Sequence, residues 1–282
     1  MIYAYRTDIG RRNSNQDSFY IPSAGTKSVV MVADGMGGHK AGNVASLIAV
    51  EAARRYIEDG SPNIRKAMLM QHAVNRANTD VHEAAKTEGC EGMGTTLVIA
   101  YLQEDMFCCA NVGDSRLYHY DGNQLTQVTH DHSLVEELAS KGAITREQIH
   151  SHPLRHVLTR AVGTEEYVKA DIFLRNWKHG DVLLLCSDGL HGVVPDSDIL
   201  WALQNGKDLF ECCDLMVDFA EWYGSTDNIT VILAKNDCNF DNAEATDWRN
   251  EPDGSGAEFK KTLGEAKERF TQMNGGNDHA ND

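Results

Sequence analysis

Short apolar runs alternate with two long amphipathic segments along most of the chain. Runs such as residues 29–33 (VVMVA) and 182–186 (VLLLC) are apolar enough to predict internal strands. Residues 41–56 and 64–86 carry apolar side chains at helical spacing, which predicts a pair of helices. Strands come in blocks with helix pairs between them, and this order favours mainly antiparallel sheets covered by helices.

The same two periodicities predict the remaining elements. Strands are expected at residues 2–9, 17–21, 28–34, 95–102, 106–112, 116–120, 124–128, 170–175, 181–187 and 228–235. Further helices are expected at residues 133–141, 146–150, 196–204 and 208–223. Residues 130–163 are polar, irregular and rich in His, so we expect them to form an inserted flap outside the core.

The composition changes after Lys235, so residues 1–235 are expected to form one domain and residues 236–282 an acidic linker and tail. A short helix is expected at residues 258–272, because four apolar residues there are spaced four, three and four apart. These residues are Phe259, Leu263, Ala266 and Phe270.

Composition limits the partners and the compartment. The formal net charge of −16 argues against a nucleic-acid partner, which would need a basic surface. The apolar runs are far too short to span a membrane, and no signal peptide is visible. Seven cysteines without a CxxC pair are typical of buried thiols in a reducing compartment. We expect a cytoplasmic monomer.

Five aspartates lie in short turns flanked by Gly, Asn or Gln. They are Asp17, Asp34, Asp114, Asp188 and Asp227. Three of the turns directly follow or interrupt an apolar, strand-like run. An ionised carboxylate at the end of a buried strand is costly unless a positive group compensates it. Clustered oxygen ligands suit Mg²⁺ or Mn²⁺, so the pattern predicts a cation site.

These turns resemble, in their order, the type 2C family of metal-dependent serine/threonine protein phosphatases in its bacterial form. The matching segments are residues 10–18 (GRRNSNQDS), 34–39 (DGMGGH), 94–96 (GTT), 113–116 (GDSR), 129–133 (THDHS), 187–189 (SDG) and 227–230 (DNIT). Each string is weak alone, but seven in the family's order are specific. The resemblance covers residues 3–235 and implies an α+β fold, a four-layer α-β-β-α sandwich of two mainly antiparallel sheets flanked by helices.

The resemblance also assigns the metal ligands. Asp34 would bridge two Mn²⁺ or Mg²⁺ ions, with the backbone carbonyl of Gly35 as a further ligand. Asp188 and Asp227 would complete the protein shell of the first ion. Two such ions can share a hydroxide at neutral pH and support in-line attack on phosphoserine or phosphothreonine without a phosphoenzyme.

The remaining roles are also implied by the resemblance. Asp17, beside Gln16, would serve the second ion, and Asp114 matches a position that can hold a third, weaker ion in bacterial relatives. Many relatives have Glu where this chain has Gln16, so we predict weaker binding of the second ion. Arg12 would bind the substrate phosphate, because its planar fork suits two phosphate oxygens. Either His39 or a metal-bound water would protonate the leaving group.

Two other functions stay open at this stage. One is a catalytically weak relative that binds phosphopeptides, and the other is a two-metal phosphatase of a small molecule. The resemblance suggests phosphorylated proteins as substrates, including a serine/threonine kinase and its targets. The histidines of the flap lack a Cys/His ligand framework, so a zinc site is not expected.

Overall fold

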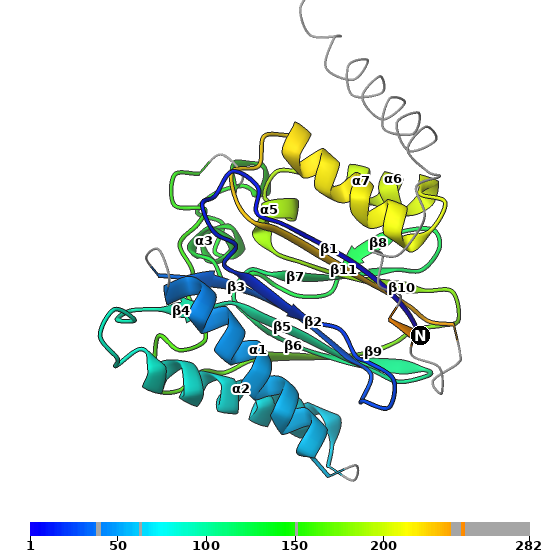
Figure 1. Ribbon diagram of the computed structural model, residues 1–282. Helices are drawn as coiled ribbons and strands as arrows, with labels where there is room; N and C mark the ends of the chain where they lie inside the picture. Colours follow the sequence, from blue (N-terminus) through cyan, green and yellow to red (C-terminus); the bar gives the residue numbers. More distant parts are fainter. Residues whose placement is uncertain (38–40, 62–63, 150–151, 238–243, 246–282) are drawn as a thin grey trace, which may run out of the picture.

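Two six-stranded sheets pack face to face and carry helices on their outer faces (Figure 1). The computed structural model describes residues 1–37, 41–61, 64–149, 152–237 and 244–245. Every strand pair in this part of the chain is antiparallel except one, the pairing of the first and last strands. The predicted four-layer α-β-β-α sandwich is therefore confirmed.

The first sheet joins strands from both ends of the chain. Its order is β12 (Glu244–Ala245), β1 (Ile2–Asp8), β11 (Ile229–Lys235), β10 (Val182–Cys186), β7 (Arg116–Tyr120) and β8 (Leu125–Gln127). The second sheet has the order β2 (Asp17–Tyr20), β3 (Val29–Met36), β5 (Leu97–Leu102), β6 (Met106–Val112) and β9 (Asp171–Asn176), and β4 (Gly94–Thr95) pairs with the end of β3.

Helices cover the two sheets from opposite sides. The long pair α1 (Ala41–Asp59) and α2 (Lys66–Ala84) packs on the second sheet, as Figure 1 shows in blue and cyan. The first sheet is covered by α5 (Asp188–His191), α6 (Asp196–Asn205) and α7 (Leu209–Trp222). Two short helices, α3 (Leu134–Ser140) and α4 (Arg146–Ile149), lie in the polar segment where the flap is expected.

The continuous apolar strands are buried on both faces. In β3, Val30 and Val32 face the opposite sheet, whereas Val29 and Met31 face the α1–α2 pair. Side chains alternate between the faces of a strand, so a strand covered on both sides must be apolar at every position. This burial explains why the sequence shows runs here without a polar–apolar alternation.

The structure differs from the predicted elements in four places. The strand predicted at residues 95–102 is divided into β4 and β5. The turn at Asp188 opens a single-turn helix, α5, and β12 was not predicted. Strand β3 continues through Met36 because Gly35 and Met36 pair with β4. The predicted tail helix at residues 258–272 lies outside the described residues. None of the helices in the described ranges is long and apolar enough to cross a membrane.

Candidate metal centre

The five predicted aspartates meet at one edge of the sandwich. Asp17 opens β2 directly opposite Asp34 in β3, and Asp114 follows β6, which runs parallel to β3. In the other sheet, Asp188 follows β10 and Asp227 precedes β11, its antiparallel neighbour. Because antiparallel neighbours start and end at the same edge, residues more than two hundred positions apart come together.

All these residues except Asp17, which is buried beneath, line a hollow of about 1250 Å³. Gln16, Gly35 and Arg12 also line this hollow.

The five carboxylates repel one another strongly. Burial raises the pKa of Asp34 well above its usual range, and the charges of Asp17, Asp188, Asp114 and Asp227 raise it further. Burial raises the pKa of Asp17 to about 7, with hydrogen bonds from neighbouring hydroxyls acting in the opposite direction. A site that makes ionised carboxylates this costly is completed by cations.

Two carboxylate oxygens in the cluster have no hydrogen-bond partner among the described residues. They are Asp17 Oδ1 and Asp188 Oδ1, and both are buried. In the described ranges, no three His, Cys, Asp or Glu side chains are gathered tightly enough to hold an ion by themselves. Mg²⁺ and Mn²⁺ keep several waters and accept backbone carbonyls, so one or two carboxylates per ion are enough. The donor set fits these hard cations.

Gly35 allows the backbone to approach the cluster. A Cβ at this position would lie 2.0 Å from Gly42 O and 2.8 Å from Gln16 O. Its N–H donates to Gln16 O at 3.1 Å, which ties the Asp34 turn to the segment before Asp17. No other residue type fits, since every side chain would displace backbone atoms.

Arg12 contacts the aspartate cluster directly. Its Nη2 donates to Asp227 Oδ2 at 2.6 Å, and its side chain remains about half exposed at the rim of the hollow. Gly10 makes the turn that directs it there, with φ of +57° and no room for a Cβ, which would lie 2.1 Å from Asp227 O. Arg11 is exposed and does not line the hollow. His39 lies outside the described residues.

Sequence reasoning missed two side chains that link the two sheets beside the aspartate cluster. Ser187 Oγ donates to Asp17 Oδ2 at 2.8 Å and accepts from Thr230 N at 3.0 Å. Asn228 accepts from Gln16 N at 2.8 Å and donates to Ile9 O and Ser14 O. The only signal in the sequence was that Ser187 and Asn228 adjoin Asp188 and Asp227.

His191 is a third residue that sequence reasoning missed. It lies three residues after Asp188 on α5, and its Nε2 is 2.9 Å from Asp114 O. The flap histidines expected to form no zinc site include His132, which is buried and accepts from Gly113 N at 3.1 Å through Nδ1.

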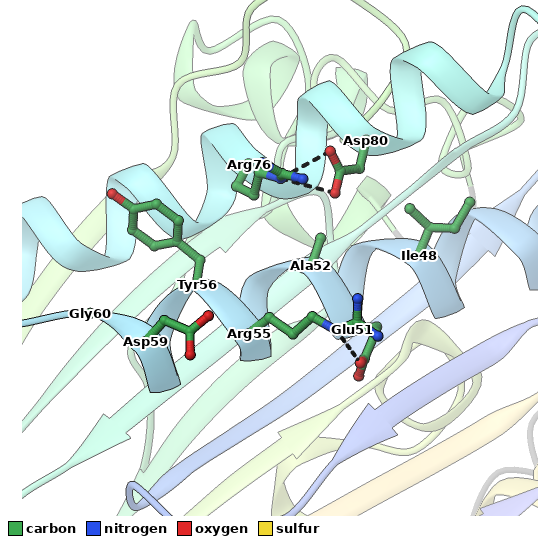
Figure 2. A pocket seen from close by; sticks show the side chains of 9 residues that line it. All are labelled: Ile48, Glu51, Ala52, Arg55, Tyr56, Asp59, Gly60, Arg76 and Asp80. Carbon is green, nitrogen blue, oxygen red and sulfur yellow. Dashed lines mark hydrogen bonds and ion pairs between the residues drawn. The ribbon is translucent and has the colours of Figure 1, made fainter.

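A second hollow, of about 570 Å³, lies on the outer surface of α1 and α2 (Figure 2). Both arginines that line it are paired with carboxylates, Arg55 with Glu51 at 2.6 Å and Arg76 with Asp80 at 3.0 Å. Asp59 adds one exposed carboxylate, so this hollow lacks the clustered, buried carboxylates of the first one. The chemistry therefore belongs to the aspartate cluster.

Residues 6–234 match the family model described as protein phosphatase 2C. The chain is 38% identical over 239 residues to the serine/threonine phosphatase stp of Listeria monocytogenes, covering 83% of this chain and 95% of that protein. It is 34% identical to the protein phosphatase PhpP of Streptococcus pneumoniae, covering 80% of this chain and 94% of that protein.

Solved structures of serine/threonine phosphatases are also similar to this fold. The Mycobacterium tuberculosis serine/threonine phosphatase PstP/Ppp superposes with a TM-score of 0.75 at 37% identity, covering 83% of this chain and 97% of that one. A catalytic domain of the phosphatase PstP in complex with two manganese ions superposes with a TM-score of 0.73 at 36% identity, covering 83% and 96% of the two chains.

Proposed function

This chain belongs to the protein phosphatase 2C family of metal-dependent serine/threonine phosphatases, and from that membership we propose how its own residues share the reaction. The family's cofactors are Mn²⁺ or Mg²⁺. The supporting observation is the buried cluster in which Asp17 and Asp188 each keep an oxygen without a partner. When bound, two divalent ions polarise the phosphate and activate a water for direct attack on phosphorus.

We propose that the carboxylates are shared between two ions. Asp34 interacts electrostatically with the other four carboxylates and would be a ligand of both ions. Asp188, Asp227 and the carbonyl of Gly35 would hold the first ion. Asp17, with the Gln16 amide beside it, would hold the second, and Asp114 with Asp188 would hold a third and weaker ion.

Arg12 would orient the substrate phosphate. Its guanidinium is already at the rim, paired with Asp227 at 2.6 Å. If Asp227 serves as a metal ligand, that pair would weaken, and the planar guanidinium of Arg12 would then be available to two phosphate oxygens. We propose that Arg12 moves from the carboxylate to the phosphate when metal and substrate bind.

His39 is the proposed general acid for the departing serine or threonine oxygen. Gly35, Met36 and Gly37 line the hollow, and His39 is two residues after Gly37 in the sequence. Its replacement by Gln should lower kcat on a phosphothreonine peptide far more than on p-nitrophenyl phosphate, whose leaving group needs no proton. Equal effects on the two substrates would assign protonation to water.

The chain acts on phosphorylated proteins, and we propose a serine/threonine kinase and its targets among them. We also propose residues 1–235 as the catalytic domain, a monomeric state and a cytoplasmic location. The described cysteines are free and five of the six are buried, which supports a reducing compartment.

Purified protein tests the function directly. It should hydrolyse a phosphothreonine peptide with Mn²⁺, stop with EDTA, and lose its activity in Asp188→Asn. The matched control, Asp59→Asn, removes an exposed carboxylate that does not line the aspartate hollow and should retain full activity. Binding of phosphopeptides without turnover under any divalent ion would contradict the proposal. So would turnover confined to small phosphate esters.

A further inference from the structure

Residues 163–170, called here the strap, cross the hollow's edge and are fastened to α2 by two side-chain amides. The first is Asn78, which is buried with 2% of its surface exposed. Its Oδ1 accepts from Gly163 N at 2.7 Å, and its Nδ2 donates to Glu165 O and Glu166 O, both at 3.0 Å. Both the oxygen and the nitrogen of this amide therefore form hydrogen bonds with the backbone of the strap.

The second amide is Gln71, which holds the far end of the strap. Its Oε1 accepts from Ala170 N at 3.2 Å, and its Nε2 donates to Val168 O at 3.4 Å. Gln71 and Asn78 are seven residues apart, so they lie on one face of the same helix. A rigid helix therefore fixes the backbone on both sides of Tyr167.

Tyr167 projects from this fixed backbone with 82% of its surface exposed, the most of any large hydrophobic residue in the described ranges. Single exposed aromatics are common and need no explanation by themselves. This one, however, lines the same hollow as the aspartate cluster, with Leu158, Ala161 and Val168 among the other lining residues. A ring held on rigid backbone loses little entropy when it binds a ligand.

The strap begins close to the Asp34 turn. Gly35 pairs with Thr95, and Thr95 pairs with Val162, so two strand spacings, or about 10 Å, separate Gly35 from Val162. An extended peptide advances about 3.3 Å per residue. A substrate side chain about three or more positions from the phosphorylated residue would therefore reach the strap.

We infer that Tyr167 is a specificity-determining residue, which packs against an apolar side chain of the substrate polypeptide about three or more residues from its phosphoserine or phosphothreonine. This inference rests on the proposed function. Glu166 accepts a hydrogen bond from the Tyr167 hydroxyl, and the strap carries Glu165, Glu166 and Lys169. Its net negative charge disfavours an acidic side chain, whereas the exposed ring favours an apolar one. Gln71 and Asn78 act as positioning residues that preorganise the strap.

The test uses phosphothreonine peptides in which one leucine moves position by position through a polar sequence. The wild-type protein should show a KM about fivefold lower at one or two positions than for the peptide without leucine. Tyr167→Ala should abolish that preference and Tyr167→Phe should keep it, both with unchanged kcat/KM on p-nitrophenyl phosphate. Leu47→Ala, an exposed apolar residue on α1, is the matched control and should behave as wild type.

Gln71→Ala tests whether the position of the strap matters for the leucine preference without a loss of folded protein. It should reduce the leucine preference through KM, with kcat on p-nitrophenyl phosphate unchanged. No leucine preference in the wild type, or the same preference in Tyr167→Ala, would overturn the inference while leaving the proposed function in place. Hydrolysis of p-nitrophenyl phosphate but of no phosphothreonine peptide would overturn both.

Discussion

Arg12 and Asp227, separated by 215 positions in the sequence, form an ion pair with Nη2 and Oδ2 2.6 Å apart at the rim of the aspartate hollow. The proposed phosphate-binding cation and the proposed metal ligand thus hold each other in place. Both side chains are partly exposed, so the pair contributes little to stability and can exchange partners at low cost.

Arg12→Ala should lower kcat/KM about 100-fold on both p-nitrophenyl phosphate and phosphopeptides. Both kinds of substrate would bind the Arg12 guanidinium through the same phosphate group. Arg11→Ala is the control, since Arg11 is exposed and lies outside the hollow. Steady-state kinetics of the two variants decide the assignment. Equal losses in both would show that general surface charge, and not Arg12, serves the phosphate.

Gln16→Glu should lower the Mn²⁺ concentration for half-maximal activity about fivefold, since a carboxylate near the second ion adds about 1 kcal/mol of attraction. Gln16 lines the hollow, and its amide packs so closely on Gly42 that a Cβ there would lie 2.7 Å from Nε2. Mn²⁺ titrations followed by activity and by calorimetry measure the change. An unchanged requirement would place Gln16 outside the influence of the second ion.

Asn78→Ala should reduce the free energy of unfolding by about 3 kcal/mol, because it leaves the buried N–H of Gly163 and the part-buried carbonyls of Glu165 and Glu166 without their partner. Denaturant titration measures the loss. Asn123→Ala, an exposed asparagine in the turn before β8, is the control and should cost less than about 0.5 kcal/mol. Similar costs for the two variants would contradict the role of Asn78 in fastening the strap.

His132 should make the protein less stable as the solution becomes acidic. Burial lowers the pKa of His132, and protonation would place an N–H against the N–H of Gly113. Arg160 lowers this pKa further, whereas Asp171 and Asp131 oppose the shift. Because the unfolded chain binds the proton more readily, stability is complete above about pH 7.5 and falls as pH drops through about 6.5.

His132→Asn keeps an acceptor for Gly113 N and does not titrate in this range. The unfolding free energy of the variant should therefore fall less between pH 7.5 and 5.5 than that of the wild type. Chemical denaturation at several pH values provides the comparison. Parallel curves for the two proteins would assign the acid sensitivity to other groups.

The local hydrophobic pattern was sufficient to predict most of the strands and helices. The short turn motifs were sufficient to identify the five aspartates. The apolar run before Asp34 and the run before Asp188 predicted buried strands with costly carboxylates at their ends, and both strands are present. The partners of these carboxylates could not be predicted in the same way. Ser187 and Asn228 act through contacts with residues about two hundred positions away, and nothing in their own neighbourhood marks those contacts.

The sequence by itself determined the order of strands and helices, the family and the residues that can carry charge to the site, because these follow from local periodicity and short motifs. Only the tertiary structure decided that Arg12 and not Arg11 faces Asp227, and that Gln71 and Asn78 hold Tyr167 at the hollow. These facts depend on strand register and on which helix face meets which loop. Both are set by packing between distant segments, and no short stretch of sequence encodes them.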